Sequence, residues 1–174
     1  MTRHIVLIGL PGAGKSTVGR LVAQAVQAPC QDIDAIVTRK EGRPIALIFA
    51  ERGEAAFRDI ERREMEDALA GPPAVIIPGG GWAAQPGALA SVRGRALLVY
   101  LKTRPDTAST RAEPQGNRPL LMGGGEDPAA QMQQLLRDRE PFYLEADEQV
   151  DTDRKSAAKV ADEVVELARR RAGW

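Results

Sequence analysis

The hydrophobic positions of this chain form short continuous runs and longer periodic stretches. The run HIVLI at residues 4–8 is β-branched and continuous rather than alternating, which is typical of a buried strand in a parallel sheet. A glycine-rich segment comes next, after which apolar residues recur at helical spacing: Val18, Leu21, Val22, Ala25 and Val26. This spacing places them on one face of a helix. The chain therefore opens with a strand, a glycine-rich turn and a helix.

The same alternation continues to the end of the chain. Two further apolar runs, at residues 74–77 and 96–101, are expected to form strands, as are two short extended pieces at residues 30–33 and 148–150. The longer helical patterns lie at residues 54–70, 128–145 and 157–168. Gly42 and Pro44 divide the stretch before residue 54 into two further helical pieces. Strands that alternate with helices predict an α/β fold, in which a parallel sheet has helices on both faces. The 174 residues suit one domain.

Composition narrows the class of protein. Lys plus Arg and Asp plus Glu number 24 each, so no net charge favours nucleic acid or an anionic membrane as a partner. The single cysteine, Cys30, excludes an intrachain disulfide and a cysteine-based zinc cluster. The single histidine, His4, opens the first strand and is expected to be structural. No apolar run approaches the roughly 20 residues that cross a bilayer, and no signal peptide is evident, so a cytoplasmic protein is expected.

The glycine-rich segment GLPGAGKST, at residues 9–17, fits the phosphate-binding P-loop pattern G-x-x-x-x-G-K-[ST]. Glycines allow backbone N–H groups to turn toward one anion, and the helix after them adds the positive end of its dipole. Lys15 is expected to reach the β- and γ-phosphates, and the Ser16 hydroxyl to ligate Mg²⁺. The expected ATP-binding residues are Gly12, Ala13, Gly14, Lys15, Ser16 and Thr17. No N-K-x-D run that could read guanine is present.

A P-loop does not identify the group that accepts the phosphate, but the segment DID at residues 32–34 is a candidate. It comes directly after the second strand-like run, and ligands of open α/β sheets bind at the carboxyl ends of strands. In an extended chain Asp32 and Asp34 would share one side. One carboxylate could hold a magnesium-bound water while the other accepts a proton from the attacking hydroxyl. The alternative is that an aspartate here caps a helix, and the two roles are compatible.

Two further segments are less specific. PGGGW, at residues 78–82, comes after the third strand, and its glycines either form a seat for a carboxylate or phosphate or make a flexible turn. Arg58 lies in the charged helical segment FRDIERREMEDAL, where exposed i,i+4 pairs are expected. Nothing local distinguishes Arg58 from Arg62 or Arg63.

Taken together and in order, seven segments resemble the shikimate kinase family: GLPGAGKST, DID, IFAERGEAAFRDIE, GGG, NRPLL, GEDP and REPFY. The resemblance extends from about residue 5 to residue 152. It implies a P-loop NTPase fold whose five-stranded parallel sheet has the strand order 2-3-1-4-5. It also implies transfer of the ATP γ-phosphate to the 3-hydroxyl of shikimate, with Mg²⁺, in the pathway to chorismate and the aromatic amino acids.

The resemblance assigns roles that local chemistry leaves open. It implies that Asp34 contacts the acceptor hydroxyls and is the candidate base, and that Asp32 lies near magnesium. It implies that Arg58 and Arg139, the latter in REPFY, hold the substrate carboxylate, a task that suits the guanidinium fork. The backbone wall of the substrate pocket is implied to be Gly79, Gly80 and Gly81.

The Gly/Pro-rich segment between the fourth strand-like run and the helix at residue 128 interrupts the alternation. The resemblance implies that residues 112–127 form a mobile lid, whose Arg118 reaches over the transferring phosphate. Such a lid would bring charge to the γ-phosphoryl group and exclude water. Arg111 and Arg154 occupy places where the family packs side chains around adenine. We expect the enzyme to act as a monomer.

Pro78 and Trp82 depart from the family's pattern, which usually reads TGGGA around these glycines. A tryptophan here either narrows the acceptor pocket or packs into the core, as buried aromatic rings mostly do. A narrowed pocket would favour a relative that phosphorylates another polyhydroxy carboxylic acid, such as gluconate. The third alternative is a nucleotide-binding module without turnover, which would not need the acceptor-site residues Asp34, Arg58, Arg118 and Arg139.

Overall fold

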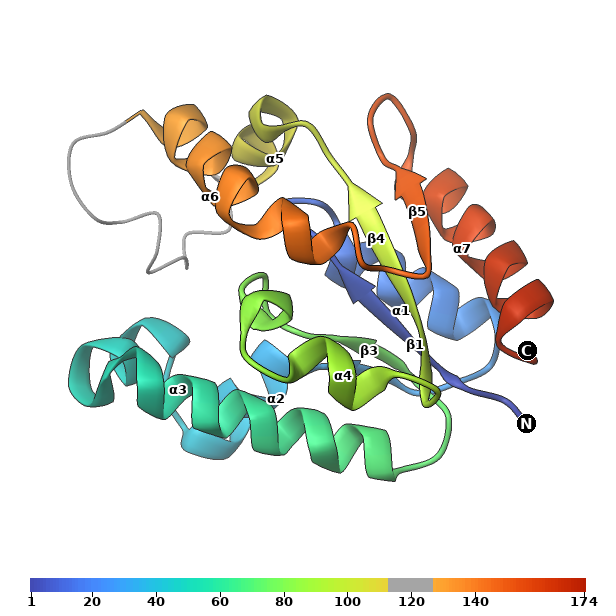
Figure 1. Cartoon of the computed structure of the whole chain (residues 1–174), viewed down its shortest axis with the longest axis horizontal. Coiled ribbons are helices and arrows are strands. Elements are labelled where there is room, and N and C mark those ends of the chain that lie inside the picture. The colour runs from blue at the N-terminus through green and yellow to red at the C-terminus, as the bar shows by residue number, and fades with distance from the viewer. Residues whose placement is uncertain (113–126) are drawn as a thin grey trace.

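The computed structural model describes residues 1–112 and 127–174. In this part of the chain five parallel strands form one sheet in the order β2-β3-β1-β4-β5, which confirms the predicted order (Figure 1). The strands are β1 (His4–Ile8), β2 (Cys30–Asp32), β3 (Val75–Ile77), β4 (Ala96–Lys102) and β5 (Glu148–Asp151). The predicted lid, residues 112–127, lies outside the described residues apart from its two ends.

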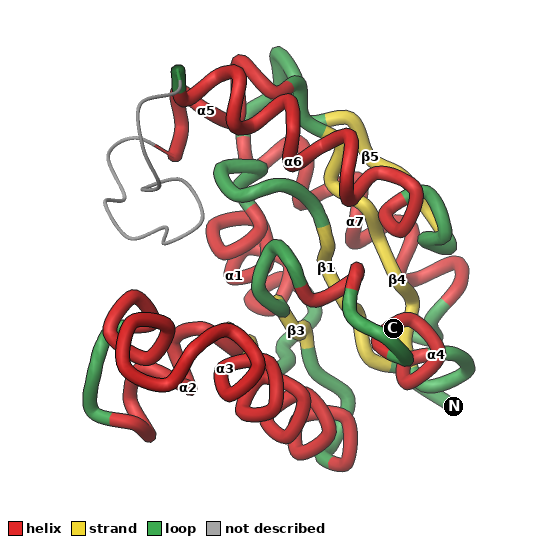
Figure 2. Tube along the Cα trace, turned by 60° about the vertical axis from the view of Figure 1, so that its left-hand side comes forward, coloured by secondary structure: helices red, strands yellow, loops and turns green. Residues whose placement is uncertain are grey.

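Helices cover both faces of the sheet. They are α1 (Lys15–Ala25), α2 (Ile33–Glu41), α3 (Ile45–Ala70), α4 (Ala88–Val92), α5 (Pro105–Ala112), α6 (Pro128–Tyr143) and α7 (Ala157–Arg171). One face packs on α1 and α7, and the other packs on the remaining helices. On that second face α2 lies along α3 near the β2 edge, and α5 lies along α6 on the β4 side (Figure 2). No helix of the described ranges is both long and apolar enough to cross a membrane.

The central strand β1 contributes to two separate cores. Val6 and Ile8 belong to the core under α2–α6, whereas Ile5 and Leu7 belong to the core under α1 and α7. All four side chains are buried, as the continuous apolar run predicted. The loop that follows β1 therefore starts from a strand that is buried on both faces in the middle of the sheet.

Three details differ from the expected elements. The strand expected at residues 30–33 ends at Asp32, because that residue caps α2 and the helix begins at once with Ile33. The segment at residues 45–70 is one long helix interrupted at Gly53, whose φ of 83° is not helical. The short helix α4 and the 3-10 turn η1 (Trp82–Ala84) lack a clear periodic pattern and were not predicted.

His4 begins β1 at the end of the strand remote from the P-loop, in a structural setting. Its side chain is buried, and its Nδ1 atom accepts a hydrogen bond of 3.2 Å from the Ala74 backbone N–H. Burial lowers the pKa of His4, and hydrogen bonds to the backbone oppose this only in part. The folded protein therefore favours the neutral imidazole.

This setting predicts how stability responds to acid. Above a pH of about 6.5 the imidazole is neutral in both the folded and the unfolded chain, so it does not change the free energy of unfolding. As the pH falls, the unfolded chain binds the proton before the folded chain does, and the free energy of unfolding therefore decreases. His4→Asn keeps an acceptor for Ala74 but cannot titrate. We expect urea unfolding of the wild type to lose stability relative to His4→Asn between about pH 7.5 and 5.5. The prediction is contradicted if the difference in the free energy of unfolding between the two proteins stays constant over this pH range.

Candidate functional site

The predicted P-loop joins β1 to α1 and curls around the start of the helix. Gly12 and Gly14 have φ values of 81° and 89°, which residues with a side chain rarely adopt. A Cβ atom at Gly12 would also collide with the carbonyl oxygen of Ala108 in α5. Gly14 precedes the first turn of α1, and no side chain from the described residues caps that turn. Its backbone N–H groups are therefore available to an anion.

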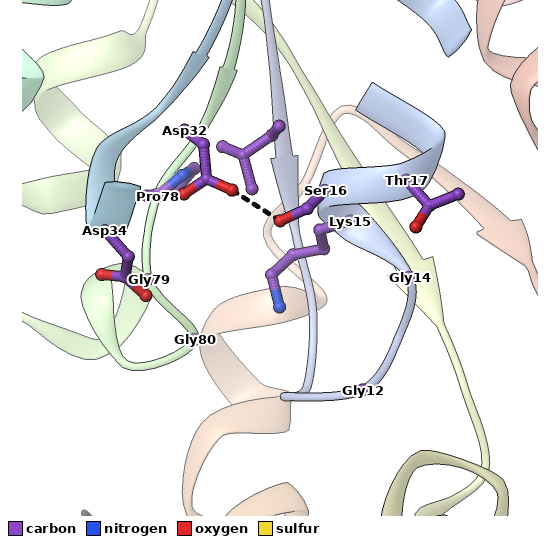
Figure 3. Close-up of a pocket in the computed structure, with 11 residues that line it drawn as sticks. Gly12, Gly14, Lys15, Ser16, Thr17, Asp32, Asp34, Pro78, Gly79 and Gly80 are labelled. Atoms are coloured by element: carbon purple, nitrogen blue, oxygen red, sulfur yellow. Dashed lines mark hydrogen bonds between the residues drawn. The ribbon is translucent and has the colours of Figure 1, made fainter. Parts of the chain in front are cut away.

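Lys15 lies over this loop and points into the pocket between Gly12 and Gly80 (Figure 3). Its Nζ atom donates hydrogen bonds of 2.8 Å to the carbonyl oxygens of Gly9 and Leu10. These contacts hold the ammonium group on the side of the loop where phosphates are expected. The arrangement is the one that a lysine of an NTP-binding loop requires.

Asp32 caps a helix, as its sequence position suggested, and also contacts the P-loop. Its Oδ1 atom accepts a hydrogen bond of 3.3 Å from the Ala35 backbone N–H and so caps α2. Its Oδ2 atom accepts a hydrogen bond of 2.6 Å from the Ser16 hydroxyl (Figure 3). Strand β2 thus brings a carboxylate to the first turn of α1.

Asp34 reaches the same pocket by a different route from the one expected. The prediction placed Asp32 and Asp34 on one side of an extended chain, and this is wrong, because Asp34 lies in the first turn of α2. Both aspartates nevertheless line one pocket together with Lys15 and Ser16. The helical turn directs Asp34 toward Gly79, away from Ser16 (Figure 3).

The three glycines after β3 approach charged side chains closely. A Cβ atom at Gly79 would lie 2.6 Å from Glu61 Oε2 and 3.1 Å from Asp34 Oδ1. A Cβ atom at Gly81 would lie 2.5 Å from Arg58 Nη2 and 3.0 Å from Arg139 Nη2. The side chains of Arg58, from α3, and Arg139, from α6, therefore meet at Gly81. The structure brings together the two guanidinium groups that are 81 positions apart in the sequence.

A buried carboxylate holds Arg58 in place. Arg58 Nη1 donates a hydrogen bond of 2.8 Å to Oε1 of Glu61, whose side chain is only 1% exposed. Burial raises the pKa of Glu61, the charge and hydrogen bond of Arg58 oppose this rise, and the nearby charge of Asp34 adds to it. Glu61 Oε2 faces Gly79. The Gly79 N–H is near enough to lower the pKa of Glu61, although its geometry does not meet the criteria for a hydrogen bond to Oε2.

Three buried polar atoms around the glycines have no hydrogen-bond partner among residues 1–112 and 127–174: Arg58 Nε, Glu61 Oε2 and Arg139 Nη1. Unpaired buried donors of a guanidinium group are costly, and an anionic acceptor relieves that cost. The two guanidinium groups lie beside Gly80 and Gly81, next to the wall of the pocket that Gly79 and Gly80 line. The site thus combines a phosphate-binding loop with a second position that can bind a carboxylate.

Of the remaining predicted residues, Pro78 lines the pocket. Trp82 is 3% exposed and packs in the core, so the structure favours the packing alternative for the tryptophan. Arg111 lies in the last turn of α5, and Arg154 lies in the turn after β5, with a left-handed φ of 58°. Neither lines the pocket. Arg118 lies outside the described residues.

Sequence reasoning gave no role to two residues that the structure places at the site. Glu61 pairs with Arg58, and the hydroxyl of Tyr143 in α6 donates a hydrogen bond of 2.6 Å to the Gly80 carbonyl oxygen. Their spacing carried a signal, because residues three and four apart lie on one face of a helix. Glu61 lies three positions after Arg58, and Tyr143 lies four positions after Arg139.

The fold and this site define a class of protein. A P-loop at the centre of a parallel sheet, with a carboxylate beside its Ser16 and a separate cationic seat, is the arrangement of a kinase that phosphorylates a small acidic molecule. A protein that only switches between nucleotide states would not need the second, cationic site. The comparisons with known proteins specify the family.

The family model described as Shikimate kinase matches residues 11–169. The shikimate kinase of Thioalkalivibrio sulfidiphilus is 41% identical over 164 residues, which cover 94% of this chain and 85% of that protein. A solved shikimate kinase from Acinetobacter baumannii, in complex with shikimate, has a TM-score of 0.92 and 32% identity, covering 98% of this chain and 94% of that one. The chain belongs to the shikimate kinase family and is an ATP-dependent kinase.

A gluconokinase from Sinorhizobium meliloti is also similar in structure. Its TM-score is 0.67 and its identity 21%, covering 99% of this chain and 94% of that one. At this identity the likeness shows the fold alone. It gives the gluconate alternative no support at the level of the acceptor site.

Proposed function

We propose that this chain transfers the γ-phosphate of ATP to the 3-hydroxyl of shikimate. The observation that carries the proposal is the pair of guanidinium groups at Gly81, each of which has a buried donor without a partner, next to the Gly79 that Asp34 approaches. Shikimate joins a carboxylate to a ring of hydroxyl groups, and the guanidinium pair and the adjoining pocket offer a binding position for each. The shikimate-bound relative supports the same choice of acceptor.

The nucleotide side of the reaction depends on the P-loop. The phosphates of ATP would accept hydrogen bonds from the backbone N–H groups at the start of α1, with Gly12, Ala13, Gly14, Lys15, Ser16 and Thr17 around them. Lys15 would exchange its two carbonyl acceptors for phosphate oxygens. The lysine thereby positions the group that is transferred and neutralises charge that develops on it.

The residues beside the P-loop fit Mg²⁺. Ser16 and Asp32 supply a hydroxyl and a carboxylate at the same point of the pocket, 2.6 Å apart, and hard oxygen ligands are those that Mg²⁺ prefers. Mg²⁺ usually takes only one or two protein ligands and completes its shell with phosphates and waters. When bound, the ion would neutralise charge on the phosphates. The described residues contain no cluster of three metal-ligating side chains, and such a site does not need one.

On the acceptor side, Arg58 and Arg139 would hold the substrate carboxylate against Gly81, and Gly79 and Gly80 would form the adjoining wall. Asp34 would then face the ring hydroxyls. As an acceptor-only carboxylate it can orient the attacking hydroxyl and take its proton as the bond to phosphorus forms. The oxygen of ADP leaves on the opposite side of the transferred group.

A coupled assay of ADP release tests the acceptor directly. The purified protein is supplied with Mg·ATP and, separately, shikimate, quinate, gluconate or no acceptor. We expect fast turnover with shikimate and a background rate with gluconate and with water. Gluconate turnover that exceeds shikimate turnover would restore the rival substrate, and no acceptor-dependent turnover would leave only nucleotide binding.

Arg58→Ala is expected to raise the KM for shikimate far more than the KM for ATP. Hydrogen bonds to charged groups are worth about 1.5–3 kcal/mol, which corresponds to roughly 10- to 100-fold in KM. Arg62→Ala is the matched control, since Arg62 lies on the same helix with a side chain that is 71% exposed. Equal increases in both KM values, or the same effect in the control, contradict the role of Arg58.

Several other expectations stay predictions. They concern Arg118 over the transferred phosphate, Arg111 and Arg154 around adenine, the monomeric state and the cytoplasmic location. Each is consistent with the proposed reaction and needs its own measurement. Sedimentation of the purified chain, for example, would report whether it is a monomer.

A further inference from the structure

The hydroxyl of Tyr143 lies between the two glycine loops of the site. Its Oη atom is 2.6 Å from the carbonyl oxygen of Gly80 and 3.2 Å from that of Gly9. A phenol has one proton, so the shorter contact to Gly80 is the stronger hydrogen bond. Tyr143 is fully buried, and burial raises its pKa, so the hydroxyl stays protonated and can donate.

The Gly80 carbonyl matters because it shares a peptide unit with the Gly81 N–H. A peptide unit is planar and trans, so the Gly80 C=O and the Gly81 N–H point in opposite directions and turn together. Glycines on both sides of this peptide allow it to rotate with little steric resistance. A donor that holds the carbonyl therefore also fixes the direction of the Gly81 N–H, at the residue where the guanidinium groups of Arg58 and Arg139 meet.

The same helix, α6, provides both the donor and one of those guanidinium groups. Arg139 and Tyr143 are one turn apart on one face of α6, and the charge of Arg139 opposes the rise in the pKa of Tyr143. Tyr143 also packs its ring on Tyr100 of β4, with the ring centroids 5.1 Å apart. The hydroxyl therefore sits on a rigid base that α6 and the sheet share.

We propose that Tyr143 is a positioning residue for the acceptor, which holds the Gly80–Gly81 peptide against the end of β1 so that Gly81 and Arg139 present a fixed seat to the substrate carboxylate. The same hydroxyl lies 3.2 Å from the Gly9 carbonyl oxygen, which accepts from Lys15, so the Gly80 peptide is held beside the start of the nucleotide loop. The effect on acceptor binding rests on the proposed function, whereas the hold on the peptide does not.

Tyr143→Phe removes the hydroxyl and leaves the ring. Tyr100→Phe is the matched control, because Tyr100 is the other tyrosine of the chain and is 1% exposed. Hydrogen–deuterium exchange on the ligand-free proteins reports the hold on the peptide. We expect amides 79–81 to exchange about 10-fold faster in Tyr143→Phe and to be unchanged in Tyr100→Phe. Unchanged exchange in Tyr143→Phe overturns the proposal whether or not shikimate is the acceptor.

Steady-state kinetics tests the consequence for binding. We expect the shikimate KM of Tyr143→Phe to rise about 10-fold while the ATP KM changes less than about 2-fold, a split that general loss of stability would not produce. Equal changes in both KM values, or an unchanged shikimate KM in an active protein, overturn the proposal. If the wild type does not phosphorylate shikimate, the proposed function fails, and the exchange result still decides the role of Tyr143.

Discussion

Lys15→Ala is expected to reduce kcat by about 10³-fold or more while the protein remains folded. The ammonium group is the one side-chain cation of the P-loop, and it lies where the β- and γ-phosphates are expected. Loss of the cation leaves charge on the transferred group uncompensated in the transition state, so kcat falls more than nucleotide affinity does. The coupled ADP-release assay gives kcat, and titration with a non-hydrolysable ATP analogue gives the affinity.

Lys159→Ala is the control for this prediction. Lys159 is exposed on α7, away from the pocket, so its loss should leave kcat unchanged. Thermal unfolding of Lys15→Ala should resemble that of the wild type, because its two hydrogen bonds go to loop carbonyls and its stem is only partly buried. Full activity in Lys15→Ala would remove the P-loop lysine from the mechanism.

Asp34→Asn is expected to reduce kcat by about 10²- to 10³-fold, with a much smaller change in the KM for shikimate. Asparagine has the same shape and can still hydrogen-bond the acceptor hydroxyl, but it cannot take the proton. The loss should therefore appear in the chemical step and not in binding. Single-turnover measurements with saturating shikimate separate the two.

The control here is Asp162→Asn, an exposed carboxylate on α7 that should tolerate the change. A raised shikimate KM with an unchanged kcat would assign Asp34 to binding alone. The proton would then have to go to another acceptor, and Asp32, which already caps α2 and accepts from Ser16, is the nearest alternative carboxylate in the sequence.

The elements that the sequence predicted well are those whose chemistry is local. The apolar run of β1, the glycines of the P-loop and the first helix are determined by neighbouring residues, and the structure has them where they were expected. The strand order came instead from the family resemblance. The wrong prediction that Asp34 lies in an extended segment also has a local cause. Asp32 caps α2, so the strand ends there, two residues before the end of the DID segment.

The parts that were missed depend on distant contacts. Arg58 cannot be told from Arg62 within its own segment, because both carry the same charge on the same helix. Arg58 differs from Arg62 in its contacts. It pairs with Glu61, about one helical turn away, and approaches Gly81, in the loop after β3. Tyr143 likewise gains its role from two carbonyl groups that lie 63 and 134 positions earlier.

The two loops of the site belong to different strands of the sheet. The nucleotide loop extends from the central strand β1, whereas the glycines of the acceptor loop come after β3, and α2 and α3 lie toward the outer edge beside β2. The buried side chains of α2 and α3 share a core with Val6 and Ile8 of β1, whereas their side chains toward the acceptor loop do not contribute to that core. A redesign of acceptor preference can accordingly be confined to the acceptor-facing side chains of residues 33–82 and α6, while the core under β1 and the machinery that activates ATP are inherited intact.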